Sequence, residues 1–193
     1  MLSDLFDTYP WFLPGLLIVL PISIAASGPV ARRLGVRRPL AWLLLVGFGV
    51  VLAATLTPGR ETFDFGFGPG GFDRGFCDMR RMRPAMSALL SINNSSLNVL
   101  LLIPLGVAIG LLPRSRAKVV ILVLAIALPF TVEFIQALVP ALGRQCESGD
   151  VIDNSTGLIV GLVIGTILGV LIPTLARGDA DPDHPADGPG PTV

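Results

Sequence analysis

The stretch VVILVLAIALPFTVEFIQAL at residues 119–138 decides the fold, because it is apolar along its whole length and contains one charged residue, Glu133. About 20 predominantly apolar residues are enough for a helix to cross the hydrocarbon core of a bilayer. We therefore predict a transmembrane helix here. A carboxylate inside such a helix is energetically unfavourable and normally has a partner or a role.

Four other segments of the chain are similarly apolar and contain no charged residue: residues 11–27, 40–57, 97–112 and 157–175. Over the whole sequence 52% of residues are hydrophobic and only 15% are charged, whereas about a quarter are charged in a typical soluble domain. This composition excludes the soluble enzyme classes. We predict an all-α, multi-pass transmembrane bundle of about five spans within residues 1–176. A disordered cytoplasmic tail is expected at residues 177–193, which are rich in Asp, Pro and Gly.

Two short turns between the predicted spans carry basic residues and no acid. They contain Arg32, Arg33, Arg37 and Arg38 in the first turn, and Arg114, Arg116 and Lys118 in the second. Short basic loops remain in the cytoplasm. We therefore expect the N-terminus outside the cell and the C-terminus in the cytoplasm.

The two cysteines, Cys77 and Cys146, both fall in loops that this topology places outside the cytoplasm. Disulfides persist in oxidising compartments, so a Cys77–Cys146 bridge is expected. The chain has one histidine and equal numbers of acidic and basic residues, 14 of each. We therefore expect no metal site, no cofactor and no nucleic-acid partner.

Glycines recur every four residues in the last span, at Gly157, Gly161, Gly165 and Gly169, and a shorter pair occurs at Gly106 and Gly110. On a helix this spacing forms a smooth groove in which another backbone can approach closely. The groove predicts helix packing, either within the chain or between copies in a homo-oligomer.

The predicted topology brings six polar residues from three spans to the outer leaflet of the membrane. They are Asn98, Glu133, Gln136, Arg144, Asp150 and Asn154. Asn98 begins the third span, Glu133 and Gln136 share a face of the fourth, and the other three are expected in the loop that enters the fifth span.

These residues form an ordered pattern. It consists of Asn98 before a Pro104-Leu105-Gly106 stretch, an ExxQ pair at Glu133 and Gln136, and Arg144 before a DxxxNxxGxxxG run from Asp150 to Gly161. The pattern resembles the VanZ-like membrane family. The family also has an acidic residue two positions before the DxxxN aspartate, where this chain has Ser148. Glu147 and Asp153 are the alternatives for that role.

The resemblance implies a bacterial plasma-membrane protein of the cell envelope, similar to teicoplanin-resistance accessory proteins. It leaves three interpretations of the polar residues. They could bind a membrane lipid or lipid-linked envelope component, with Arg144 as an anion ligand and Glu133 and Gln136 as hydrogen-bonding partners. They could form a membrane-embedded enzyme, with Glu133 as acid or base and Asp150 as the second carboxylate. They could be purely structural, with Glu133 paired to Arg144 while Asp150 and Asn154 cap the fifth span.

Overall fold

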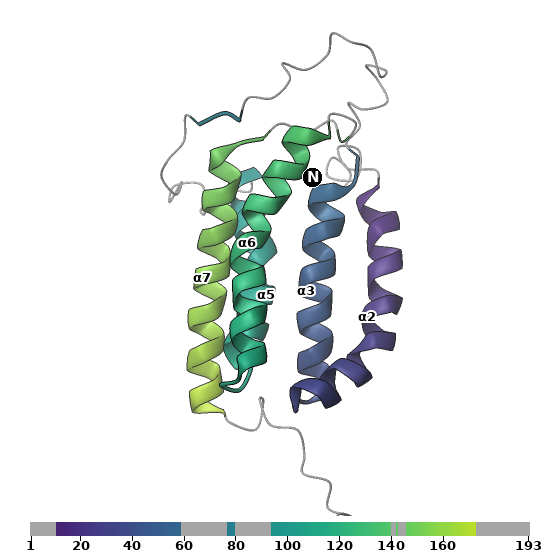
Figure 1. Cartoon of the computed structure of the whole chain (residues 1–193), viewed down its shortest axis with the longest axis vertical. Helices are drawn as coiled ribbons and strands as arrows, with labels where there is room; N and C mark the ends of the chain where they lie inside the picture. Colours follow the sequence, from purple (N-terminus) through teal and green to yellow (C-terminus); the bar gives the residue numbers. More distant parts are fainter. Residues whose placement is uncertain (1–10, 59–76, 80–93, 140–141, 143–145, 173–193) are drawn as a thin grey trace, which may run out of the picture.

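The described part of the computed structural model consists of five long helices, which lie side by side as a bundle in Figure 1. The structure describes residues 11–58, 77–79, 94–139, 142 and 146–172. The helices are α2 (Phe12–Leu34), α3 (Arg38–Leu56), α5 (Asn94–Leu111), α6 (Arg116–Leu138) and α7 (Ser148–Leu171). Each is long and apolar enough to cross a membrane, which confirms the predicted all-α bundle of five spans.

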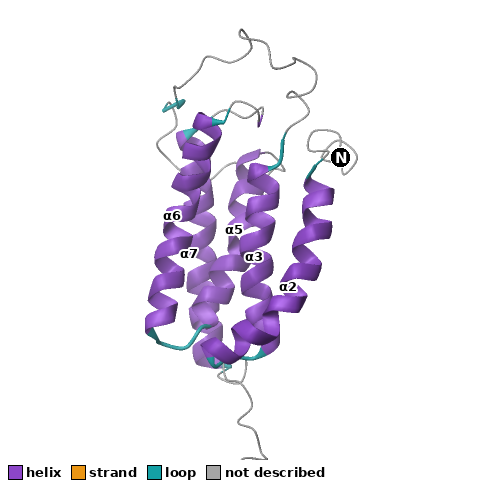
Figure 2. Ribbon diagram, turned by 45° about the vertical axis from the view of Figure 1, so that its right-hand side comes forward, coloured by secondary structure: helices purple, strands orange, loops and turns teal. Residues whose placement is uncertain are grey.

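Helix α5 lies at the centre of the bundle, between α3 on one side and α7 on the other, whereas α2 packs against α3 at the edge (Figure 2). The side chains of Leu102, Leu105, Ala108 and Ile109 on α5 are completely buried. Gly47 of α3 lies against the backbone of Leu105, where an added β-carbon would stand 3.1 Å from its Cα atom. The core is therefore built around α5.

Large apolar side chains cover the outward faces of the other helices. Exposed examples are Leu17 and Ile22 on α2, Val123 and Phe134 on α6, and Val170 on α7. In water such faces would be unfavourable, but they match the hydrocarbon of a bilayer. The small buried core and apolar exterior are consistent with a bundle that lipid surrounds.

Two tight turns close one end of the bundle. Helix α2 ends at Gly35, whose φ of +65° is the left-handed conformation that glycine adopts readily. Arg38 then donates from Nε to the Ser27 hydroxyl, 3.0 Å away. In the second turn, Lys118 donates from Nζ to the carbonyls of Gly110 and Leu112, each at 2.9 Å. We call this end of the bundle, at residues 35–37 and 112–115, the basic end.

Helices α5 and α7 run parallel and share the most extensive helix contact. A β-carbon at Gly157, Gly161 or Gly165 would collide with a backbone carbonyl oxygen of α5; these oxygens belong to Val99, Ile103 and Val107, respectively. Gly106 and Gly110 of α5 meet the α7 backbone in the same way, at Leu158 and Thr166. Gly169 has more space, with its closest neighbour at 3.7 Å. The glycine groove is thus filled by α5 of the same chain at Gly157, Gly161 and Gly165.

The ends of several helices differ from those that hydropathy alone indicates. Helix α2 continues to Leu34, α5 begins at Asn94, and α7 begins at Ser148, nine residues before the first glycine of its apolar segment. Hydropathy locates the part of a helix that suits lipid, whereas backbone hydrogen bonds determine where the helix begins and ends. The predicted tail at residues 177–193 lies outside the described residues.

Candidate functional site

Buried polar side chains gather at the end of the bundle opposite the basic end. We define the polar cluster as Thr55, Ser96, Glu133, Gln136, Asp153 and Asn154, all at most 6% exposed. It draws on four helices: α3 and α6 end here, and α5 and α7 begin here. The predicted convergence therefore involves one helix more than expected, because α3 contributes Thr55.

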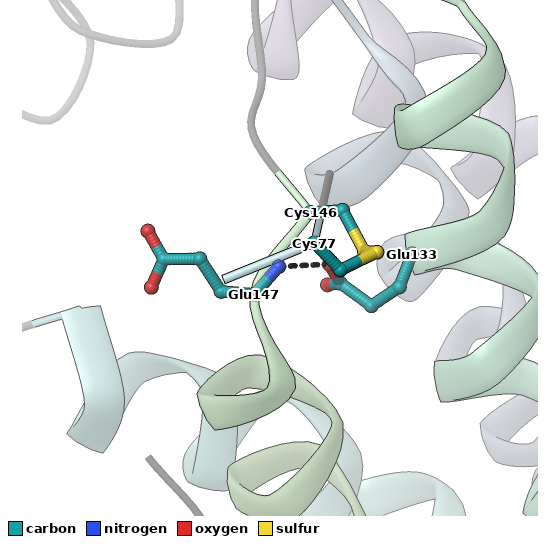
Figure 3. The surroundings of a disulfide bond; sticks show 4 residues. All are labelled: Cys77, Glu133, Cys146 and Glu147. Carbon is teal, nitrogen blue, oxygen red and sulfur yellow. Dashed lines mark hydrogen bonds between the residues drawn. A yellow bond between two sulfur atoms is a disulfide. The ribbon is translucent and has the colours of Figure 1, made fainter. Parts of the chain in front are cut away.

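Glu133 lies in the last part of α6 and is 4% exposed. Its carboxylate oxygen Oε2 accepts a hydrogen bond of 2.8 Å from the backbone N–H of Glu147, the residue that immediately precedes α7 (Figure 3). A carboxylate at the start of a helix satisfies a free N–H and interacts favourably with the helix dipole. Glu133 therefore joins the end of α6 to the beginning of α7. Arg144, the partner considered from the sequence, lies outside the described residues.

Gln136 lies three residues after Glu133 on the same face of α6 and is 5% exposed. Its Nε2 atom donates a hydrogen bond of 2.9 Å to the carbonyl oxygen of Thr55, one of the last carbonyls of α3. The last four carbonyls of a helix have no partner within it, so Gln136 supplies a donor that α3 itself cannot. The ExxQ pair thus connects α6 to two different helices.

The structure differs from the sequence interpretation at Asp150 and Asn154, which we expected in a loop or as helix caps. Both lie inside α7, and the capping position belongs to Glu147. Asp150 is half-buried in the first turn, where a negative charge is favourable. Asn154 lies one turn later, too far along to cap the helix.

Asp153 and Glu147 were the alternatives for the additional acidic position, and they lie in different environments. Asp153 is 1% exposed, whereas Glu147 is exposed and its carboxylate points away from Glu133 (Figure 3). Asp153 is therefore the acid that belongs to the polar cluster. One signal in the sequence could have identified it, since Asp153 continues the four-residue spacing of Gly157, Gly161 and Gly165.

Asn98, like Asp150, is outside the polar cluster. It lies in the second turn of α5 and is half-buried, whereas Ser96 on the same helix is buried. Sequence reasoning missed Ser96 and Thr55, because short hydroxyl side chains in an apolar helix give no clear signal before the neighbouring helices are known.

The Oδ1 atom of Asn154 is buried and has no hydrogen-bond partner among the described residues. The residue as a whole is 3% exposed. A buried polar atom without a partner costs about 1–3 kcal/mol, and such atoms are uncommon in folded proteins. Asn154 is therefore the unsatisfied acceptor of the polar cluster.

The predicted disulfide between Cys77 and Cys146 is present, with a Cα–Cα distance of 4.6 Å. It lies directly beside Glu133 and Glu147 (Figure 3). The parts of the chain that the structure describes contain no group of three or more His, Cys, Asp or Glu residues arranged to hold a metal ion.

The VanZ/LLP1 family model matches residues 16–169, which include α3, α5 and α6, most of α2 and α7, and all six of the predicted polar residues. Neither a curated protein nor a solved structure matches the chain significantly. The matched region is about four-fifths of the 193 residues. The chain is therefore a multi-pass membrane protein that belongs to the VanZ/LLP1 family.

Proposed function

We propose that the protein binds or modulates a membrane lipid or lipid-linked component of the bacterial cell envelope through the polar cluster. The observation that carries this proposal is the unsatisfied Oδ1 atom of Asn154. Within a membrane, water is scarce, so an unpaired acceptor is especially unfavourable. A hydroxyl, amide or amine of a bound molecule would donate a hydrogen bond to this Oδ1 atom, once the helix ends around it separate slightly.

The orientation that suits this function places the polar cluster in the outer leaflet. All described basic residues lie at or beside the basic end, namely Arg32, Arg33, Arg37, Arg38, Arg114, Arg116 and Lys118. The described acids all lie towards the opposite end, namely Asp78, Glu133, Glu147, Asp150 and Asp153. With the basic end in the cytoplasm, the cluster faces components that are exported across the bacterial plasma membrane. Glycopeptide susceptibility, particularly to teicoplanin, is the phenotype that the family resemblance indicates.

Glu133 and Gln136 have a supporting role in this proposal. Each already makes a hydrogen bond to the backbone of a neighbouring helix, so they hold α3, α6 and α7 around Asn154. Buried polar groups that are satisfied in this way also restrict a site to one arrangement. The structural interpretation of these two residues is thus compatible with a binding site formed by their neighbours.

The enzyme interpretation has less support from the contacts. The carboxylate of Glu133 is engaged by the Glu147 N–H. The hydroxyl of Thr156 in α7 donates to the Ile152 carbonyl of its own helix at 2.7 Å. Neither contact prepares a nucleophile, which would need an adjacent base.

The test is binding of a polyprenyl-linked disaccharide to the full chain in lipid nanodiscs, measured by native mass spectrometry. Asn154→Leu has nearly the same shape but cannot accept a hydrogen bond. We expect it to weaken binding about tenfold, the equivalent of one buried hydrogen bond. The matched control is Thr131→Val, because Thr131 lies on the exposed face of α6 and its hydroxyl donates to the Ala127 carbonyl of its own helix.

Equal binding by Asn154→Leu and the unaltered protein would refute the proposed role of the cluster. Polyprenyl phosphate without the disaccharide serves as a second probe. If it binds equally well and responds equally to Asn154→Leu, the cluster recognises the lipid and not the sugar.

A further inference from the structure

The segment that enters α7 is fixed by one covalent bond and two backbone hydrogen bonds. The disulfide connects Cys146 to Cys77, 69 residues earlier in the chain. Beside it, the Asp78 N–H donates to the Cys146 carbonyl at 2.8 Å, and the Ser148 N–H donates to the Asp78 carbonyl at 2.9 Å. These contacts form an isolated parallel β-bridge between Asp78 and Glu147.

This pairing determines the direction in which the N–H of Glu147 points. Glu147 is extended, with φ −131° and ψ 125°. In an extended chain, successive backbone groups point to opposite sides. Since Cys146 and Ser148 direct their bonding groups toward Asp78, the intervening N–H of Glu147 is directed away from it, toward Glu133 (Figure 3).

We propose that the Cys77–Cys146 disulfide is a redox-controlled positioning element for the Glu133 carboxylate. While the bridge is intact, the Glu147 N–H stays on Glu133, and the polar ends of α6 and α7 stay together. When the bridge is reduced, the pairing with Asp78 loses its covalent support, and the bond from Glu147 to Glu133 is released. Cys77 and Cys146 are positioning residues in this proposal, because they act through the backbone of Glu147.

The two cysteines of the disulfide differ in solvent exposure. Cys77 is exposed, whereas Cys146 is 8% exposed. A dithiol reductant would reach Cys77 first, and its thiolate would form a mixed disulfide there while Cys146 leaves as a thiolate. The second thiol of the reductant then releases Cys77. The balance is one dithiol oxidised to a disulfide and one protein disulfide reduced to two thiols.

The control of ligand binding by this switch rests on the proposed function, but the control of Glu133 does not. The first experiment therefore needs no ligand. It measures how much the melting temperature of the detergent-solubilised full chain falls on reduction with dithiothreitol followed by alkylation. We expect the fall in Glu133→Leu to be about half of that in the unaltered protein. This variant already lacks the hydrogen bond between Glu147 and Glu133 that reduction would release.

Gln136→Leu is the matched control, since Gln136 is buried on the same face of α6 but bonds to Thr55 of α3. It should show the full fall in melting temperature. Equal falls in all three proteins would overturn the proposal. If Glu133→Leu does not fold, amide hydrogen exchange on the unaltered protein replaces it: reduction should accelerate exchange in the segment that contains Glu147, and unchanged exchange would overturn the proposal.

The second experiment compares binding of the polyprenyl-linked disaccharide by oxidised and reduced protein. We expect at least about a threefold loss on reduction. If Asn154→Leu weakens binding but reduction does not, the switch is refuted while the proposed function stands. In the opposite case, reduction lowers the melting temperature of Glu133→Leu less than that of the unaltered protein, but Asn154→Leu leaves binding unchanged. The proposed function then fails, and the positioning of Glu133 stands.

Discussion

The α5–α7 pair and helix α6 are held in the bundle by different means. Between α5 and α7, glycines bring the two backbones into direct contact. Helix α6 instead makes side-chain hydrogen bonds at the polar cluster, from Glu133 to the start of α7 and from Gln136 to the end of α3. Shape complementarity fixes the first contact along its length, whereas polar bonds hold α6 near its two ends, from Lys118 at the basic end and at the polar cluster. The polar-cluster end lies beside the disulfide and the unsatisfied acceptor, so it is the part that a ligand or a redox change can alter.

The largest effect is expected from adding a methyl group in the glycine contact. Gly161→Ala would place a β-carbon on the Ile103 carbonyl and force the two helices apart, with a loss of about 3 kcal/mol of stability. The measurement is thermal melting of the purified protein together with its accumulation in membranes.

The matched control for that substitution is Gly169→Ala on the same helix. Its nearest neighbour would be at 3.7 Å, an ordinary van der Waals distance. Its effect should stay within about 0.5 kcal/mol. Similar losses for both variants would contradict the view that direct backbone contact holds α5 to α7.

The next effect concerns the attachment of α6 to α7. Glu133→Leu leaves the Glu147 N–H without its acceptor and should destabilise the protein by about 2 kcal/mol, as for other hydrogen bonds to charged groups. Glu133→Gln retains an acceptor oxygen and should lose about half as much. Chemical denaturation of both variants would distinguish these cases, and equal losses would mean that the bond to Glu147 is not what Glu133 contributes.

A smaller loss is expected where α6 meets α3. Gln136→Leu removes the donor to the Thr55 carbonyl and should destabilise the bundle by about 1 kcal/mol, the value typical of a neutral hydrogen bond. The same denaturation measurement applies, with Thr131→Val as the exposed control on α6. A loss as large as that of Glu133→Leu would place the main attachment of α6 at α3.

The smallest effect on stability, with the opposite sign, is expected at Asn154. Asn154→Leu removes an acceptor that has no partner in the described structure, so stability should stay constant or rise by up to about 1 kcal/mol. An increase in melting temperature together with weaker ligand binding would show the exchange of stability for function that binding sites often exhibit. A clear decrease would indicate that Asn154 has a structural role.

Hydropathy and charge were enough to predict the five helices and the disulfide, because lipid imposes a strong constraint on composition. They could not predict which helices pair in parallel or what each polar group contacts. Glu133 is an example, because its carboxylate accepts a hydrogen bond from the backbone N–H of Glu147. Nearly every residue has a backbone N–H, so the sequence does not indicate which of them is the donor. Hydropathy likewise places the first turns of α7 in a loop, since Asp150 and Asn154 are polar and lie before the apolar segment.

The parallel pairing of α5 with α7 also has a consequence for biosynthesis. The two helices can run in the same direction only because α6 returns the chain across the bundle between them. A ribosome makes α5 first, so its face at Gly106 and Gly110 enters the membrane before the partner backbone exists. This close backbone contact is consequently assembled after the other described helices have been made, and until α7 is translated the central helix packs against α3, α6 and surrounding lipid.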